Sequence, residues 1–300
     1  SITQGGPLSY CLAAVAIATS ALIVRRVLKP SISKKFAKKR VVLTGASAGI
    51  GLALAHKLAS CDAEICLVAR RKERLEELKE ELKAKYPNCR VHIIPADVSE
   101  KEQCKTLIQN AVDAMQGIDV LLLNAGIGCL IRLDAVPEDD LDVCQNIMNV
   151  NYIANVNLSY FALPWLKKAK GMIIVNSSLA GIGWSPGRCF YSASKHALRG
   201  FFNSLRCEVG DTVQITTVYP GFVLSEIHDK AYHEAGKTLQ RGKGFMTADR
   251  CAELILQGAA NGERDYCMTW LGSFALKTTP FLGSLSDYIA IRKAKAGISQ

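Results

Sequence analysis

The sequence predicts an α/β fold in which one doubly wound parallel sheet carries helices on both faces. Short apolar, β-branched runs recur after residue 40, and stretches with helical patterning separate them. Regular alternation of strand and helix is typical of a parallel sheet covered on both sides. Each chemically distinctive motif also follows one of the apolar runs, as expected of ligand sites at the carboxyl ends of parallel strands.

The composition excludes several classes of protein. The chain has 300 residues, of which 49% are apolar and 21% charged, and this excludes intrinsic disorder and suits one large domain or two small ones. The eleven cysteines include no CxxC pair and no spacing typical of zinc ligands. We therefore expect reduced thiols and no metal site.

The amino-terminal segment, residues 1–28, is predicted to form a membrane anchor. Residues 8–24 are largely apolar and uncharged, and seventeen such residues approach the minimum length of a spanning helix. A cleaved signal peptide and an amphipathic surface helix are the alternatives.

Basic residues are concentrated next to this segment. Residues 25–40 contain eight lysines and arginines, and residues 1–40 contain no acid, which leaves +2 of the net +10 to the other 260 residues. We expect residues 29–40 to form a basic linker that holds the folded domain on the cytosolic side of a membrane. No basic surface interleaved with aromatic residues is visible elsewhere, so no nucleic-acid partner is expected.

Residues 41–265 are predicted to form the folded domain. Apolar runs predict strands, and amphipathic stretches predict the helices between them. The expected strands are residues 41–44, 65–69, 91–94, 120–123, 172–175 and 215–219, and the expected helices are 52–59, 71–85, 100–115, 137–168 and 190–208. Residues 266–300 are expected to be a helical extension that contacts either the membrane or a dimer partner, because apolar residues there are flanked by basic ones.

A glycine-rich turn, TGASAGIG at residues 44–51, joins the first strand to the first helix. Glycines let the backbone approach a pyrophosphate, and the amino end of a helix attracts the anion. A turn that serves packing alone is the alternative, because the spacing differs from GxGxxG. The residues expected to bind a dinucleotide here are Gly45, Ser47, Ala48, Gly49, Ile50 and Gly51.

The end of the second strand indicates which dinucleotide is bound. An acidic residue there would bind the ribose of NAD, but this chain has Arg70 and Arg71. Guanidinium groups suit a 2′-phosphate, so they predict NADP(H); solvated arginines at a helix start are the alternative. Further contacts are expected after the next two strands, from Asp97, Val98, Asn124, Ala125 and Gly126.

The motif YSASK places Tyr191 and Lys195 one helical turn apart on the same face. A phenol with an ordinary pKa of about 10 is a poor acid or base near neutral pH. A lysine cation beside it is expected to lower that pKa. Ser178 lies just past the fifth strand and could hold a substrate oxygen.

Together these motifs, in this order, resemble the short-chain dehydrogenase/reductase family in its single-domain, Rossmann-type form. The resemblance covers residues 41–219 and extends more loosely to about residue 260. The stretches 177–208 and 246–254 are most similar to the membrane-associated group that includes 11β-hydroxysteroid dehydrogenase type 1, and above all to the dehydrogenase/reductase member 7 group. The matching motifs are TGASAGIG (44–51), NAG (124–126), MNVN (148–151), Ser178, YSASK (191–195) and PG (220–221).

The resemblance implies a role for each catalytic residue. Tyr191 would exchange a proton with the substrate oxygen, and Ser178 would orient that oxygen. Lys195 would lower the tyrosine pKa and bind the nicotinamide ribose, and Asn151 would hold a water linked to Lys195. Tyr191, Lys195, Pro220, Gly221 and Val223 would also contact the cofactor, and Ser178, Trp184 and Phe190 the substrate.

One departure from the family pattern bears on cofactor choice. Ala48 stands where many NADP-preferring members carry a basic residue. The preference predicted for this chain therefore depends on Arg70 and Arg71.

The expected function is NADP(H)-dependent interconversion of a carbonyl and a secondary alcohol on a lipophilic substrate such as a steroid, retinoid or lipid ketone. A 3-oxoacyl or 3-oxosphingoid reductase is one alternative, and a membrane-tethered NADPH-binding regulatory protein is another. The expected partners are this substrate, the membrane and a second copy in a homodimer. The expected location is the endoplasmic reticulum membrane, with the domain in the cytosol by the charge rule, whereas the steroid dehydrogenase relative works in the lumen.

Overall fold

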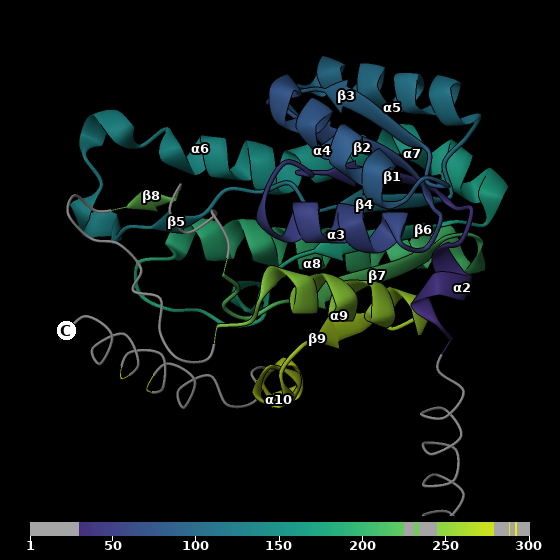
Figure 1. Cartoon of the computed structure of the whole chain (residues 1–300). Helices are drawn as coiled ribbons and strands as arrows, with labels where there is room; N and C mark the ends of the chain where they lie inside the picture. The colour runs from purple at the N-terminus through teal and green to yellow at the C-terminus, as the bar shows by residue number, and fades with distance from the viewer. Residues whose placement is uncertain (1–29, 225–230, 234–244, 279–287, 289–291, 293–300) are drawn as a thin grey trace, which may run out of the picture.

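A computed structural model describes residues 30–224, 231–233, 245–278, 288 and 292. The predicted fold class is confirmed: one parallel sheet is covered by helices on both faces (Figure 1). Among the described residues, the sheet has seven strands in the order β3-β2-β1-β4-β6-β7-β9. These strands are β1 (Arg40–Thr44), β2 (Glu64–Ala69), β3 (Val91–Pro95), β4 (Val120–Leu123), β6 (Met172–Asn176), β7 (Gln214–Tyr219) and β9 (Asp265–Cys267).

The strand order places a switch point in the middle of the sheet. The chain runs outward from β1 through β2 to β3, then returns to place β4 on the other side of β1. In open α/β sheets, ligands bind at this reversal, beyond the carboxyl ends of the strands. The fold therefore positions a site above β1 and β4.

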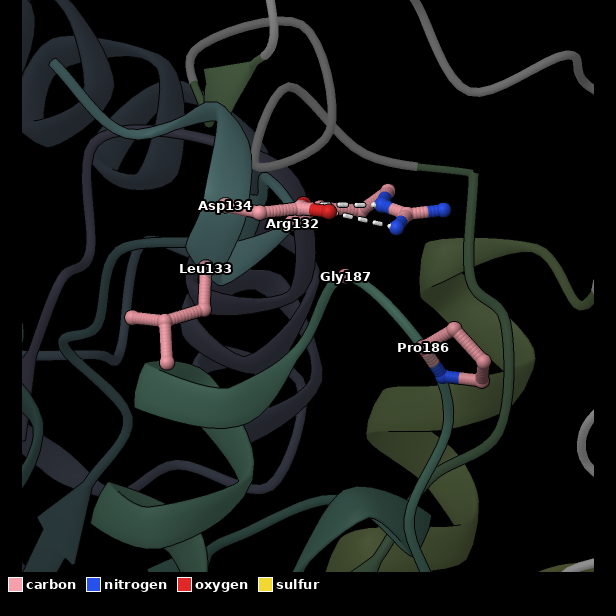
Figure 2. Close-up of a pocket in the computed structure, with 5 residues that line it drawn as sticks. All are labelled: Arg132, Leu133, Asp134, Pro186 and Gly187. Atoms are coloured by element: carbon pink, nitrogen blue, oxygen red, sulfur yellow. Dashed lines mark hydrogen bonds and ion pairs between the residues drawn. The ribbon is translucent and has the colours of Figure 1, made fainter.

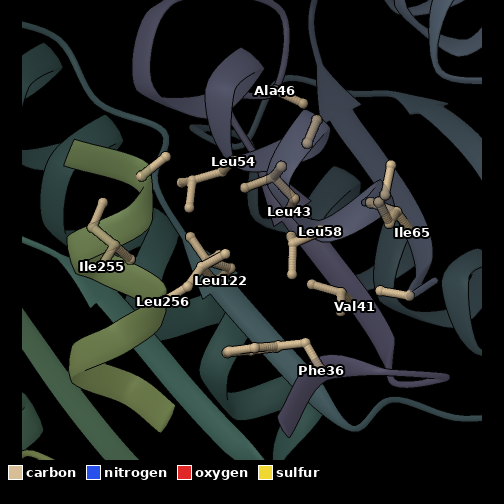
Figure 3. Packing of buried hydrophobic residues seen from close by; sticks show 14 of the residues in the cluster. Phe36, Val41, Leu43, Ala46, Leu54, Leu58, Ile65, Leu122, Ile255 and Leu256 are labelled. Atoms are coloured by element: carbon tan, nitrogen blue, oxygen red, sulfur yellow. The ribbon is translucent and has the colours of Figure 1, made fainter. Parts of the chain in front are cut away.

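Different helices cover the two faces of the sheet. The face with α3, α4 and α9 is shown in part in Figure 3, and α5, α7 and α8 pack on the other face. The longer helices are α3 (Gly49–Ala59), α4 (Lys72–Lys85), α5 (Lys101–Met115), α7 (Ala154–Ala169), α8 (Cys189–Val209), α9 (Ala248–Ala260) and α10 (Trp270–Thr278). The shorter elements are α2 (Ile32–Phe36), β5 (Cys129–Leu130), η1 (Leu133–Ala135), η2 (Glu138–Asp140), α6 (Val143–Met148), η3 (Asn149–Ile153), η4 (Leu179–Gly181), η5 (Gly210–Thr212) and β8 (Tyr232–His233).

Strand β1 shows how the sheet joins the two cores. Val41 and Leu43 belong to the cluster with α3 and α9, and Val42 belongs to the cluster with α5 and α7. All three side chains are fully buried. Successive side chains on a strand point to opposite faces, so a continuous apolar run is what a sheet covered on both sides requires.

A basic linker was expected at residues 29–40, but residues 30–40, which the structure describes, are part of the folded domain. Residues 32–36 form α2, and Phe36 is fully buried in the core cluster that also contains Leu58 (Figure 3). Lys34 and Lys35 stay on the surface, so the segment is a short amphipathic helix. The expectation failed because it weighed the charge of the segment and not its single large apolar side chain.

The predicted membrane anchor, residues 1–28, lies outside the described residues. Within the part of the chain that the structure describes, no helix is both long and apolar enough to cross a membrane.

The single helix expected over residues 137–168 is broken into several pieces. A π-helical turn, η3, separates α6 from α7 and contains the fully buried Asn151. π-helical turns within helices occur frequently at functional sites. The apolar periodicity of the segment could not distinguish this turn from a regular helix.

Near the carboxyl end, the structure adds a strand and a helix that the sequence analysis did not predict. Strand β9 adds to the sheet as far as Cys267, two residues beyond the expected boundary at residue 265. Helix α9 was not predicted, although Thr247 caps it by accepting a hydrogen bond from the Arg250 N–H at 3.2 Å. Helix α10 lies within the expected helical extension.

Candidate active site

The predicted motifs meet at one edge of the sheet because the strands are parallel. The glycine-rich turn follows β1, the NAG motif follows β4, Ser178 follows β6, and the PG motif follows β7. Helix α8 begins near this edge and carries Tyr191 and Lys195. The topology therefore assembles residues that are up to 176 positions apart in the sequence.

The glycine-rich turn fits a phosphate group in its shape. Gly45 has a left-handed φ of +67°, and a Cβ there would lie 2.9 Å from the Cα of Ala125. A Cβ on Gly51 would lie 1.9 Å from the carbonyl oxygen of Gly45. Glycine therefore allows the turn to fold tightly over the first residues of α3, and no side chain caps the amino end of that helix. Its free N–H groups suit an anion.

Asn124 joins this turn to the next strand. Its amide Nδ2 donates to the carbonyl oxygens of Thr44 at 3.0 Å and Gly45 at 3.2 Å. The backbone N–H of Asn124 donates to the Thr44 hydroxyl, also at 3.0 Å. Asn124 therefore holds the turn in place through its amide nitrogen.

The two predicted phosphate-binding arginines have different surroundings. Arg71 Nη2 donates to the Ser47 hydroxyl at 3.1 Å, which places a guanidinium and a hydroxyl together at the turn. Arg70 Nη1 instead lies 3.7 Å from the Asp97 carboxylate. Asp97 also accepts hydrogen bonds from the backbone N–H and hydroxyl of Ser99.

The structure brings Tyr191, Ser178 and Lys195 together. Tyr191 is 8% exposed, and the Ser178 side chain lies near enough to lower the pKa of its phenol. The Lys195 ammonium lies 5.7 Å from the centroid of the tyrosine ring and donates to the carbonyl oxygen of Asn176 at 3.3 Å. A phenol, a hydroxyl and an amine thus lie side by side, as the sequence predicted.

Asn151 connects these groups to the loop after β4. Its Oδ1 accepts from the Ile127 N–H at 2.8 Å, and its Nδ2 donates to the Ile127 carbonyl at 3.0 Å and to the Ser194 hydroxyl at 3.1 Å. A Cβ on Gly126 would lie 3.2 Å from Asn151 Oδ1 and 3.7 Å from Lys195 Nζ. Asn151 therefore sets the spacing between this loop and α8. Its predicted role in holding a water stays a prediction.

A chain of amides links the two parts of the site. Asn176 Nδ2 donates to Asn124 Oδ1 at 2.8 Å, and the Asn176 carbonyl accepts from Lys195. Asn124 in turn holds the glycine-rich turn. A continuous set of hydrogen bonds thereby joins the turn to the lysine.

The protonation of the pair differs from the sequence expectation. Burial raises the pKa of Tyr191 and outweighs the hydrogen bond with Ser178 and the charge of Arg188, which both lower it. Burial also lowers the pKa of Lys195 to about 8. The lowered tyrosine pKa that we expected was wrong for this structure, because desolvation disfavours the phenolate.

The remaining predicted residues lie around this centre. The Pro220 carbonyl accepts from the Leu179 N–H at 2.9 Å, and Gly221 lies against the Leu179 side chain, so the PG motif adjoins Ser178. Val223 is buried and Val98 is nearly buried. Phe190 packs against the apolar cluster that contains Tyr191, whereas Trp184 is 42% exposed. Contacts of these residues with cofactor or substrate stay predictions.

Arg188 is a residue of this site that the sequence reasoning missed. Its guanidinium Cζ lies 5.7 Å from the ring centroid of Tyr191 and 5.7 Å from that of Phe222. It precedes Tyr191 by three residues and so lies one helical turn away on the same side. The signal in the sequence was a single basic residue in the otherwise uncharged stretch before YSASK.

A solvent-facing pocket of about 580 Å³ adjoins this arginine. It lies between η1 and the turn at Pro186 and Gly187, the residues just before Arg188 (Figure 2). The Arg132 guanidinium spans part of it and binds the Asp134 carboxylate through two hydrogen bonds, at 2.9 and 2.6 Å. Among the described residues, no cluster of His, Cys, Asp or Glu side chains could hold a metal ion.

Comparison with known proteins identifies the family. The family model described as short chain dehydrogenase matches residues 39–236. A "Dehydrogenase/reductase SDR family protein 7-like" of Dictyostelium discoideum is 35% identical over 276 residues, which cover 91% of this chain and 86% of that protein. An "11-beta-hydroxysteroid dehydrogenase-like 2" of Arabidopsis thaliana is 36% identical over 228 residues, covering 75% of this chain and 71% of that protein.

Solved structures agree with this assignment. An alcohol dehydrogenase from Thermococcus sibiricus, complexed with 5-hydroxy-NADP, has a TM-score of 0.67 and 26% identity and covers 76% of this chain and 94% of its own. The L-sorbose reductase of Gluconobacter frateurii, complexed with NADPH and L-sorbose, has a TM-score of 0.65 and 25% identity and covers 77% of this chain and 95% of its own. The family resemblance found in the sequence is confirmed. The chain therefore belongs to the short-chain dehydrogenase/reductase family, and it is an oxidoreductase that acts on alcohol or ketone groups with a nicotinamide cofactor.

Proposed function

We propose that the protein interconverts a carbonyl and a secondary alcohol on a lipophilic substrate, with NADP(H) as cofactor and Tyr191 as the general acid and base. The observation that carries this proposal is the placement of a buried phenol near the Ser178 hydroxyl and beside the Lys195 amine, at the switch point of the sheet. A reaction at a carbonyl needs one group to orient the oxygen and another to supply its proton.

The preference for NADP(H) is supported by the contact between Arg71 and Ser47. A guanidinium beside a hydroxyl, next to the uncapped amino end of α3, suits a 2′-phosphate better than a bare ribose hydroxyl. Arg70 supports this less, since it is engaged with Asp97. The residues described at the turn would hold the pyrophosphate through backbone N–H groups.

In the reductive direction, the chain would supply the proton. The bound reduced nicotinamide supplies a hydride to the carbonyl carbon and is oxidised. Ser178 would donate a hydrogen bond to the carbonyl oxygen and orient it toward Tyr191. Tyr191 would then transfer its phenolic proton to that oxygen, which yields the secondary alcohol and leaves a phenolate. The raised pKa of Tyr191 keeps the phenol protonated at neutral pH, which suits this direction.

Lys195 would stabilise the phenolate that this step leaves. With a pKa of about 8, its ammonium form dominates at neutral pH. An ammonium beside the ring favours the charged form of the tyrosine, so the barrier to proton transfer falls. The same lysine would hydrogen-bond the nicotinamide ribose, and Asn151 would help to keep the two helical residues aligned.

A lipophilic substrate is supported by the side chains around the tyrosine. Cys129, Val143 and Ile147 are buried against it, and Phe190 packs on the same cluster. Phe222 is 52% exposed and stacks on Phe245 with ring centroids 5.2 Å apart. The name of one relative, "11-beta-hydroxysteroid dehydrogenase-like 2", also supports an apolar substrate. A 3-oxoacyl or 3-oxosphingoid chain is the second candidate.

The proposed function is tested with a substrate panel. The purified protein is incubated with NADPH or NADH and with steroid, retinoid, long-chain and 3-oxoacyl ketones, and cofactor consumption is followed together with product analysis. We expect turnover with NADPH at a kcat/KM at least about tenfold above that with NADH. Tight NADPH binding without turnover of any ketone or alcohol would instead favour the regulatory-protein alternative.

Membrane attachment and dimer formation complete the proposal. The anchor expected at residues 1–28 lies outside the described residues, and Trp270 and Phe274 on α10 are 81% and 56% exposed. Exposed aromatic side chains on one helix suit a membrane surface or a second copy. Alkaline extraction and protease protection of sealed microsomes test the attachment and the side of the membrane, and light scattering of the purified protein tests the dimer.

A further inference from the structure

Arg188 is a cation for which the described residues supply no anion. Within the described chain, its guanidinium makes no ion pair and no hydrogen bond, in contrast to Arg132, Arg40 and Arg250, which bind carboxylates at 2.6 to 2.8 Å. It is partly buried between two aromatic rings, those of Tyr191 and Phe222. Arginine placed over a ring face gains a modest electrostatic attraction, which leaves its N–H donors unused.

The cost of this arrangement argues for an incoming partner. A charge that is partly removed from water without a counter-ion is unfavourable, and burial lowers the pKa of Arg188 accordingly. The other basic group beside the tyrosine, Lys195, also lacks a carboxylate partner among the described residues. The surroundings of Tyr191 are thus positive on two sides, with apolar side chains between.

We propose that Arg188 binds an anionic oxygen group of the substrate, so that the preferred substrates are apolar oxo acids and the matching hydroxy acids. This inference rests on the proposed function, since it concerns the same site. A planar guanidinium with five donors binds a carboxylate through two parallel hydrogen bonds, which also fixes the orientation of the bound molecule.

The geometry limits where the acid group stands on the substrate. Arg188 and Tyr191 are three residues apart at the start of α8, and the guanidinium lies 5.7 Å from the tyrosine ring. A carbonyl oxygen on the Tyr191 hydroxyl and a carboxylate on Arg188 must therefore be separated by only a few bonds. The apolar remainder of the molecule would extend along Phe222 and Phe190.

The test compares acids with their methyl esters, which differ in charge and little in shape. The kcat/KM of an apolar oxo acid and of its methyl ester is measured with NADPH for the wild type, Arg188→Met, Arg188→Lys and Arg132→Met. Arg132→Met is a matched control, because Arg132 lines the neighbouring pocket and is neutralised by Asp134. A non-reducible alkyl carboxylate is also titrated into the protein with NADPH, and its Kd is measured by calorimetry.

We expect the wild type to prefer the acid over the ester by about tenfold to a hundredfold, as for a charged hydrogen bond. In Arg188→Met that ratio falls to about one, in Arg188→Lys it is partly kept, and in Arg132→Met it stays within about threefold of the wild type. The Kd of the alkyl carboxylate rises by a similar factor only in the Arg188 variants.

Two results would overturn the inference while the proposed function stands. In the first, the wild type reduces ester and acid equally well. In the second, Arg188→Met slows both to the same extent and shifts the pH profile, which would assign the arginine to Tyr191 instead of the substrate. Turnover of neither compound, with Arg188-dependent binding of the alkyl carboxylate, would reject the proposed function and keep the anion site.

Discussion

The two halves of the site differ in how their polar groups are satisfied. The cofactor half is formed by the loops after β1 to β4, and its polar side chains bind other groups of the protein. Asn124 donates to Thr44 and Gly45, and Arg70 lies against Asp97. The substrate half, formed by residues 178–191 and 220–224, contains the exposed ring of Phe222 and the guanidinium of Arg188, which has no ion pair with any residue that the structure describes.

This difference reflects what each half must recognise. The pyrophosphate is common to NAD and NADP, so backbone N–H groups and glycines that are held rigidly by neighbours suffice to bind it. A substrate differs between relatives, and the groups that select it cannot already be neutralised by the protein. We therefore expect the Arg188 guanidinium of the substrate half to determine substrate specificity.

Changing the rigid half is expected to have the largest effect. In Gly51→Ala, the new Cβ would lie 1.9 Å from the Gly45 carbonyl, so the turn must open and the phosphate donors disperse. We expect the Kd for NADPH to rise at least about a hundredfold. Tryptophan fluorescence titration measures it.

Gly200→Ala is the matched control for that experiment. No atom lies within 4 Å of a Cβ on Gly200, which is inside α8. Cofactor affinity should be unchanged and unfolding stability should rise by about 1 kcal/mol, because alanine favours a helix. If Gly51→Ala bound NADPH as tightly as Gly200→Ala does, the glycine-rich turn would not be rigid.

Lys195 lies between the two halves, and its burial lowers the free energy of unfolding of the protein at neutral pH. Its pKa is about 8 in the folded protein, below the ordinary lysine pKa of 10.5, so the unfolded chain holds the proton more tightly. The penalty is complete below about pH 8 and vanishes above the unfolded pKa. Lys195→Met should therefore raise the free energy of unfolding by about 3 kcal/mol at pH 7 and abolish turnover.

Urea unfolding between pH 7 and pH 10.5 measures this gain, which should shrink as the pH rises. Lys101→Met, at an exposed position in α5, serves as the control and should change stability by less than about 0.5 kcal/mol. An unchanged stability of Lys195→Met across this range would mean that the lysine is not desolvated.

The preference for NADPH over NADH tests the roles of Arg70 and Arg71 in the cofactor half. Arg71→Ala removes the guanidinium beside Ser47 and should lower the ratio of kcat/KM for NADPH to that for NADH by about tenfold. Arg70→Ala should lower it less, because Arg70 lies against Asp97. Steady-state kinetics with both cofactors give the ratios, and equal effects of the two variants would contradict the assignment of Arg71.

The pH profile of reduction is the mildest test. Lys195 loses its proton above about pH 8, and the neutral amine no longer favours the phenolate that proton donation leaves. The kcat/KM for reduction should fall by about tenfold between pH 7 and pH 9. Alcohol oxidation should rise with pH, because the raised pKa of Tyr191 leaves little phenolate at neutral pH. A flat reduction profile would remove Lys195 from the mechanism.

The cofactor half was also the more predictable half. Strands β1 and β4 match the expected residues 41–44 and 120–123 to within one residue, because continuous apolar runs mark strands buried on both faces. The glycine-rich turn and YSASK are local patterns whose chemistry depends on spacing alone. The sequence therefore predicted which groups meet at the edge of the sheet.

The substrate half depended on tertiary contacts that no local pattern contains. The π-helical turn that holds Asn151, the position of the Arg188 guanidinium and the burial of Tyr191 by Cys129, Val143 and Ile147 arise from packing between distant segments. For the same reason the direction of the tyrosine pKa was predicted wrongly. Burial is a property of the assembled cluster and not of the motif.

The most direct test of the central claim is a single-turnover measurement on Tyr191→Phe, in which only the phenolic oxygen is lost. The protein is saturated with NADPH, its Kd is measured by fluorescence, and reduction of the best ketone from the panel is followed. The account predicts a rate at least about a thousandfold below the wild type, with the Kd for NADPH within about threefold. Reduction at a rate close to that of the wild type would show that Tyr191 does not supply the proton.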